Sequence, residues 1–233
     1  DAARDAGTGD EGRGGGWQRL LLCSVSGVLV FFSFPNFNLW PLVWIGFVPA
    51  IWATRQSSPR RAFTWGWWTG AVANVGGFYW IAHLLQRFGH LPWAVAVALT
   101  LLFVVYQGLL FAAFFWLLRR LRDRAPRLPY TLLVPVLMTG LELVMPYIFP
   151  WYLSIGQARI LTVIQVADLT GPLGAAFLLM LVNGMVLDLL TAWRERRGQP
   201  WPWRPVIAGA ALLAAALLYG MVRLQQIDRR WGG

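Results

Sequence analysis

The sequence contains no lysine, one cysteine and two histidines among its 233 residues. A single cysteine excludes an intrachain disulfide, and His83 and His90 lack the neighbouring cysteines or carboxylates that a metal site needs. Cys23 lies in an apolar run without a histidine or lysine nearby, so we expect it to pack rather than to act as a nucleophile. The sequence therefore predicts no catalytic residue, no metal site and no cofactor in this chain.

Charge is also scarce, because charged residues make up 13% of the chain and only 10 residues are acidic. In contrast, 58% of the residues are hydrophobic, 15 are tryptophan, and the mean hydropathy is +0.54. This composition is typical of integral membrane proteins and rare in soluble domains. The net charge of +10 comes from arginines in short loops between apolar runs, which argues against a nucleic-acid partner.

Apolar runs long enough to cross a bilayer recur along the chain. A hydrocarbon core of about 30 Å requires about 20 apolar residues in a helix. Residues 146–169 are apolar but are broken by prolines and Gly156, so we expect an interfacial or re-entrant segment there. The predicted fold class is an all-α integral membrane bundle of about seven transmembrane helices, with this segment between the fifth and sixth. The helices are predicted at 17–34, 38–54, 63–85, 91–118, 129–145, 170–192 and 205–222.

The arginine positions predict the orientation of the bundle. With the N-terminus in the cytoplasm, the outer side carries few arginines and the positive-inside rule is obeyed. The outer arginines are then Arg87, Arg159, Arg223, Arg229 and Arg230. Seven crossings place the C-terminus outside. Residues 1–16 are predicted to be a disordered tail, 17–225 the membrane domain, and 226–233 the start of a linker to a further domain of a longer protein.

The rest of the chain is organised around the stretch Glu142–Gln157. Two prolines end an apolar helix there and aromatic residues crowd the break; these are Pro146 and Pro150, with Tyr147, Phe149, Trp151 and Tyr152. Tyr and Trp favour the membrane–water interface, so we expect the chain to fold over the membrane surface here. We predict that Trp151, Tyr152 and Gln157 meet lipid headgroups. The alternative is that Phe149–Trp151 only seats the loop against the helices.

Further polar and aromatic residues have two interpretations each. Glu142 lies about one turn before the break, and a carboxylate inside a membrane suggests function, with a structural bond to Arg159 or to a backbone amide as the alternative. Tyr79 and Trp80 follow two glycines and form a second candidate substrate contact, which helix packing explains equally well. Asp168 is predicted to cap a helix start, and Asp188 to lie at a helix end.

Four stretches of the sequence occur in a characteristic order. They are Phe32–Pro41, Gly77–Trp80 with Arg87–Pro92, Phe149–Trp151 with Gln157, and Leu169–Gly174 leading to Phe177 and Asn183. Together they resemble the membrane part of apolipoprotein N-acyltransferases over about residues 17–225. Two positions depart from that family. Met145 and Pro146 follow Glu142 where an arginine is frequent, and Ser154-Ile-Gly-Gln157 replaces Gly-Tyr-Ser-Gln.

The resemblance implies acyl transfer from a phospholipid to the α-amino group of a diacylglyceryl-cysteine at a lipoprotein N-terminus. In that family the reaction occurs on the outer, periplasmic face of the bacterial inner membrane, and a nitrilase-like domain after the seventh helix supplies a Glu-Lys-Cys triad. Because this chain has no lysine, we expect it to bind phospholipid and lipoprotein but to be inactive alone, with the catalytic domain in cis or in trans. The predicted substrate-binding residues are Trp151, Tyr152, Gln157, Glu142, Tyr79 and Trp80.

Other functions stay open at this point. A non-catalytic lipid-binding or scaffold module would work with a separate catalytic partner. A small-solute transporter would show midplane polar residues and internal repeats, and neither is visible in the sequence. A different lipid-modifying enzyme would use His83 as an intramembrane base.

Overall fold

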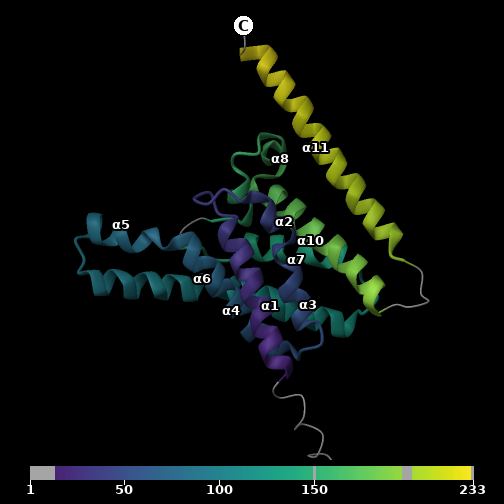
Figure 1. The fold of residues 1–233 in the computed structure, drawn as a ribbon. Helices are drawn as coiled ribbons and strands as arrows, with labels where there is room; N and C mark the ends of the chain where they lie inside the picture. Colours follow the sequence, from purple (N-terminus) through teal and green to yellow (C-terminus); the bar gives the residue numbers. More distant parts are fainter. Residues whose placement is uncertain (1–13, 149–150, 196–200, 232–233) are drawn as a thin grey trace, which may run out of the picture.

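The computed structural model describes residues 14–148, 151–195 and 201–231, and every regular element in these parts of the chain is a helix. Figure 1 shows a central body from which the hairpin of α5 and α6 projects on one side, while α11 runs along the other. The predicted all-α class is confirmed. The elements are α1 (Gly14–Phe32), η1 (Trp40–Leu42), α2 (Val43–Gly46), α3 (Val48–Thr54), α4 (Pro59–Phe78), α5 (Trp80–Gly89), α6 (Trp93–Arg124), α7 (Tyr130–Val144), η2 (Leu153–Gln157), α8 (Leu161–Ile164), α9 (Ala167–Thr170), α10 (Pro172–Glu195) and α11 (Trp203–Trp231).

Within the described residues, four helices are long and apolar enough to cross a membrane. They are Gly15–Phe32, Trp93–Arg124, Pro172–Arg194 and Trp203–Arg230, which fall on the first, fourth, sixth and seventh predicted spans. The other predicted spans are shorter or broken: 38–54 contains η1, α2 and α3, 63–85 falls in α4 and α5, and 129–145 becomes the 15-residue helix α7. The count of seven crossings stays a prediction.

Helical structure also reaches into both segments that were predicted to flank the membrane domain. Helix α1 begins at Gly14, and α11 continues without interruption to Trp231. The remaining residues of those segments, 1–13 and 232–233, lie outside the described residues. The division of the chain at residues 16 and 225 stays a prediction.

The second predicted span is broken at Phe47, and a side chain from α10 holds the break together. Pro49 stands in the first turn of α3, where its missing N–H is tolerated. Asn183 of α10 is fully buried; its Oδ1 accepts the Phe47 N–H at 2.9 Å and its Nδ2 donates to the Val43 carbonyl at 2.9 Å. Because unsatisfied backbone groups are costly in an apolar core, Asn183 allows a non-helical turn inside the bundle.

Where the end of α1 meets the end of α4, aromatic rings pack directly on glycine backbone. A Cβ at Gly76 would lie 1.7 Å from Cδ2 of Phe31, and one at Gly77 would lie 2.0 Å from Cε1 of Phe34. Any larger residue would push the end of α1 away from α4. The prediction that small residues here allow close helix packing is confirmed, and this packing fixes where Tyr79 begins the turn into α5.

The first turn of α7 is capped by a carboxylate from another helix. Pro129 precedes α7 and offers no side-chain cap. Asp188 of α10 instead accepts the N–H groups of Tyr130 and Thr131, each at 2.9 Å, and the Thr131 hydroxyl at 2.8 Å. Asp188 therefore satisfies the free donors at the start of α7, which the residues of α7 leave uncapped. The prediction that Asp188 lies at a helix end is wrong, because α10 continues for about two turns beyond it to Glu195.

We predict that Asp188→Ala destabilises the fold by about 2 kcal/mol or more, because three buried donors lose their acceptor. The thermal unfolding of the purified chain in detergent measures this. Cys23, which is buried, reports unfolding through a thiol-reactive fluorophore.

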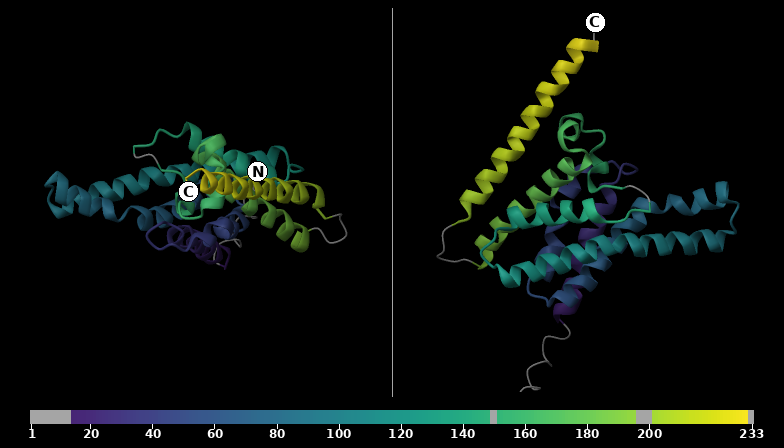
Figure 2. Two further views of the ribbon diagram at one scale, coloured as in Figure 1. Left: turned by 90° about the horizontal axis from the view of Figure 1, so that it is seen from above. Right: turned by 180° about the vertical axis from the view of Figure 1, so that it is seen from behind.

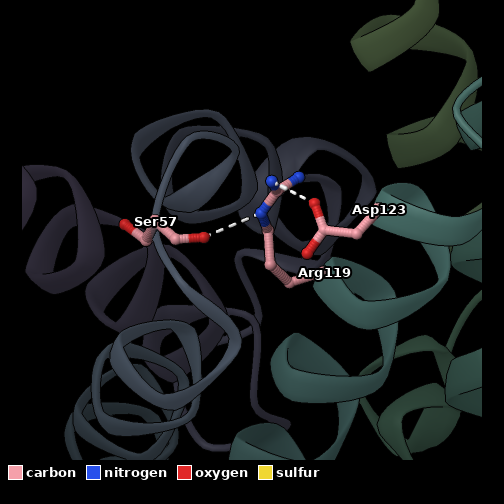
Figure 3. A network of polar contacts seen from close by, with 3 residues as sticks. All are labelled: Ser57, Arg119 and Asp123. Atoms are coloured by element: carbon pink, nitrogen blue, oxygen red, sulfur yellow. Dashed lines mark hydrogen bonds and ion pairs between the residues drawn. The ribbon is translucent and has the colours of Figure 1, made fainter.

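Asp123→Asn is the matched control, since Asp123 is an exposed carboxylate. Figure 3 shows Arg119 of α6 between the Asp123 carboxylate and the Ser57 carbonyl, to which Arg119 Nε donates at 2.7 Å. Losing an exposed pair of this kind costs at most about 1 kcal/mol. Equal unfolding temperatures for the two variants would contradict the capping role of Asp188.

Candidate functional site

The stretch after α7 does not continue as a long helix. Its described residues, 146–148 and 151–169, contain only the short helices η2, α8 and α9 before the chain turns. Phe149 and Pro150, two residues of the predicted aromatic break, lie outside the described residues. We call the described residues 146–148 and 151–169 the bend. It packs against the ends of α1 and α4, at the same end of the body as the start of α10.

Trp151 is buried in an aromatic cluster rather than spread on the surface. It is 4% exposed and stacks on Phe34, with 5.1 Å between ring centroids and 11° between planes. Phe78 meets it edge-on at 5.8 Å. These contacts join the bend to α1 and α4, and each aromatic pair adds about 1 kcal/mol to the burial of its surface.

Glu142 fixes the start of η2. This carboxylate is 2% exposed, and its Oε1 accepts the Leu153 N–H at 2.7 Å. Its second oxygen has no hydrogen-bond partner within the described residues. Of the alternatives drawn from the sequence, the bond to a backbone amide is the contact that the structure contains. Substrate contact by Glu142 stays a prediction.

Gln157 is fully buried and ties the bend to η1 and α2. Its Oε1 accepts from Trp44 Nε1 at 3.2 Å, and its Nε2 donates to the Trp40 carbonyl at 3.1 Å. The neighbouring Gly156 lies so close to α1 that a Cβ would be 2.4 Å from the Ser33 carbonyl oxygen. The bend is therefore held by polar side chains and by close backbone contact.

The remaining predicted site residues reach the surface. Tyr79 is 50% exposed at the junction of α4 and α5. Trp80 is partly buried and its Nε1 donates to the Gly77 carbonyl at 2.9 Å. Tyr152 is also partly buried, with its ring edge-on to Tyr147 at 5.8 Å.

An apolar groove of about 570 Å³ opens between α5 and α6 and is closed at one end by the bend. Trp80 and Leu84 line it from α5, Leu99 and Tyr106 from α6, and Ile148 from the bend. The Tyr106 hydroxyl donates to the Pro146 carbonyl. A groove of this size and composition fits a long apolar ligand.

Sequence reasoning found Trp80 but missed the rest of the groove. The signal was present in α5, where Ile81, Leu84, Leu85 and Phe88 share one helix face while His83 and Arg87 lie off it. Nothing in the sequence indicated that this face would meet α6 only partly.

Other predicted residues have structural partners. Asp168, which was predicted to cap the start of the sixth span, lies in the first turn of α9 and accepts from Arg223 Nε at 2.8 Å. Cys23 is buried in the core. The His83 ring packs edge-on against Trp93 at 5.1 Å. Among the described residues, no three His, Cys, Asp or Glu side chains cluster closely enough to hold a metal ion.

The fold and site define a helical membrane protein with an apolar groove beside a bend made of short helices. A family profile described as the apolipoprotein N-acyltransferase N-terminal domain matches residues 26–185. The chain belongs to this family and corresponds to that N-terminal domain.

Relatives from three bacteria carry the name apolipoprotein N-acyltransferase. The protein of Geobacter metallireducens is 36% identical over 208 residues, which is 88% of this chain and 40% of that protein. Those of Bdellovibrio bacteriovorus and Rhodopirellula baltica are 34% and 30% identical over 68% and 86% of this chain. The chain spans 40% or less of the length of these relatives.

We predict that Glu142→Ala loosens the bend, because the Leu153 N–H loses its buried acceptor. Trypsin cleavage after Arg159, an exposed residue in the bend, should become about tenfold faster, since cleavage requires local unfolding.

Glu142→Gln retains an oxygen that can accept the same bond and should be cleaved at nearly the wild-type rate. Cleavage after Arg127, in the loop before α7, is the internal reference. A bend cleaved equally slowly in both variants would show that Glu142 does not hold it.

Proposed function

We propose that this chain forms the membrane part of a lipoprotein N-acyltransferase, in which it binds a phospholipid acyl donor and a diacylglyceryl-cysteine acceptor. The observation that carries the proposal is the apolar groove between α5 and α6, which ends at the bend. Both substrates have long acyl chains with a polar end, so a groove that runs from lipid toward an ordered polar segment suits them.

Apolar burial alone cannot hold an acyl chain here, because lipid tails in the bilayer are equally apolar. Selective binding of a substrate lipid must come from the shape of the groove and from polar groups at its end. The Tyr106 hydroxyl lies there against the Pro146 carbonyl. Tyr79 directly precedes the groove residue Trp80, and Tyr152 packs on Tyr147, which directly precedes the groove residue Ile148. These aromatic residues favour the membrane–water interface, where headgroups lie.

The predicted substrate-binding residues then divide by their burial. Tyr79, Trp80 and Tyr152 have exposed surface with which to contact a substrate. Glu142, Trp151 and Gln157 are buried and act by holding the bend in position. A bend that is fixed before binding loses less conformational entropy when it binds.

The membrane topology that fits this role has seven crossings, with the N-terminus in the cytoplasm and the bend at the outer surface of the bacterial inner membrane. Arg119 of α6 bonds to Ser57 in the turn before α4 (Figure 3), so the arginine-rich ends of α3, α4 and α6 lie on the same side of the bundle. Arginine gathers on the cytoplasmic side of membrane proteins. The shorter helices, among them α7, complete the crossings within this bundle.

The covalent chemistry belongs to a nitrilase-like domain outside this chain, in cis or in trans. There a cysteine thiolate attacks the phospholipid ester carbonyl, forms a thioester and releases a lysophospholipid. The lipoprotein α-amine then attacks the thioester, forms an amide and returns the thiol. The role of the described residues is to bring both lipids to the outer surface and to orient them.

The test is acyl transfer by a protein that carries this chain together with a nitrilase-like domain. Leu99→Trp narrows the groove and should lower kcat/KM for transfer about tenfold, equivalent to ~1.4 kcal/mol. Leu101→Trp is the matched control: Leu101 is an exposed residue of α6 that does not line the groove.

Unchanged transfer in Leu99→Trp would overturn the role of the groove. If the chain bound phospholipid but supported no transfer with any such domain, it would instead be a non-catalytic lipid-binding module.

A further inference from the structure

Helix α11 approaches the rest of the protein very closely at two points, each marked by a glycine. A Cβ at Gly209 would lie 2.8 Å from Met185 Sδ, and one at Gly220 would lie 2.0 Å from the Thr162 carbonyl oxygen. The two glycines are about three helical turns apart and so share one face. Over the most apolar part of α11, only 11% of the residues are buried. Between the two glycines, Leu213, Ala216 and Tyr219 pack against a small buried cluster of Val166, Leu178 and Leu181, so α11 meets α10 along a narrow line and leaves apolar surface beside it.

A second apolar groove, of about 530 Å³, lies between these two contacts. Leu212, Ala216 and Tyr219 line it from α11, and Leu173 and Phe177 line it from α10. Figure 2 shows α11 on the opposite side of the body from the α5–α6 hairpin. This groove is thus separate from the one assigned to acyl transfer.

A pair of opposite charges stands at one end of this second groove. Asp168 immediately precedes Leu169 of the groove wall, and Arg223 follows Tyr219 by one turn of α11. Arg223 Nε donates to Asp168 Oδ2 at 2.8 Å, and the two side chains remain 36% and 42% exposed. This bond uses one of the five donors of the guanidinium and one oxygen of the carboxylate. Both groups therefore keep hydrogen-bonding capacity for a ligand.

We propose that this groove binds one glycerophospholipid with a zwitterionic headgroup. An acyl chain lies between α10 and α11, the phosphate accepts from Arg223, and the headgroup ammonium faces Asp168. A net anionic headgroup fits less well, because the Asp168 carboxylate repels it. The bound lipid completes the contact of α11 with the body. The proposal does not depend on acyl transfer.

Photo-cross-linking of the purified chain in lipid nanodiscs tests the proposal. The probes are phosphatidylethanolamine and phosphatidylglycerol that carry the same diazirine acyl chain, and labelled peptides are mapped by mass spectrometry. We expect the ethanolamine probe to label 173–178 and 212–219 about fivefold more than the glycerol probe, a ratio typical of exposed charge pairs.

Two substitutions separate the headgroup from the chain. Asp168→Asn should remove the preference between the probes, whereas Asp123→Asn, which breaks the exposed pair with Arg119, should leave it intact. Ala216→Trp fills the groove and should remove most labelling by both probes. Ala214→Trp is its control, because Ala214 is exposed on α11 and does not line the groove.

Equal labelling by the two probes in the unaltered chain would overturn the zwitterionic headgroup site, and so would a preference that survives Asp168→Asn. If Ala216→Trp leaves labelling unchanged, the labelled lipid surrounds the protein without occupying the groove. That result would also overturn the proposal.

Discussion

The structure depends on satisfying backbone polar groups wherever a helix is broken inside an apolar body. Each such break costs free energy unless its N–H and C=O groups find partners. Asn183 accepts from the backbone at the Phe47 break, Asp188 accepts at the start of α7, and Glu142 accepts at the start of η2. Gln157 donates to the Trp40 carbonyl. Asn183, Asp188 and Gln157 reach partners more than 50 residues away in the sequence, and Glu142 reaches across 11 residues. These bonds stabilise turns inside the bundle, where an unsatisfied backbone would otherwise favour continuous helices.

The ordered breaks place the two surfaces that carry the proposals. Packing of Phe31 and Phe34 on Gly76–Gly77 sets where α4 gives way to α5, and so where the α5–α6 groove begins. Glu142, Trp151 and Gln157 hold the bend that closes this groove with Ile148. The same bend continues through α8 and α9 to Thr162 and Asp168, which meet α11. Residues of the bend therefore line both grooves, Ile148 the first and Val166 and Leu169 the second.

Much of this was visible in the sequence because it depends on local chemistry. Scarce charge and long apolar runs predict the all-helical membrane class, and Pro146 with its aromatic neighbours predicts a bend after α7. The partners could not be predicted, since they depend on how distant helices meet. Asn183 was noticed only as part of a family-like motif, yet it bonds to residues near position 45. Trp151 and Gln157 suggested surface contacts by residue type, whereas the tertiary packing buries them.

Hydrogen–deuterium exchange of the unaltered chain in lipid nanodiscs tests the central claim most directly, namely that the bend is an ordered segment held by buried side chains. Amides of residues 151–158 should exchange at least about tenfold more slowly than those of the loop 125–128, because local opening must first break the bonds to Glu142 and Gln157. Exchange of the bend as fast as that loop would contradict the account.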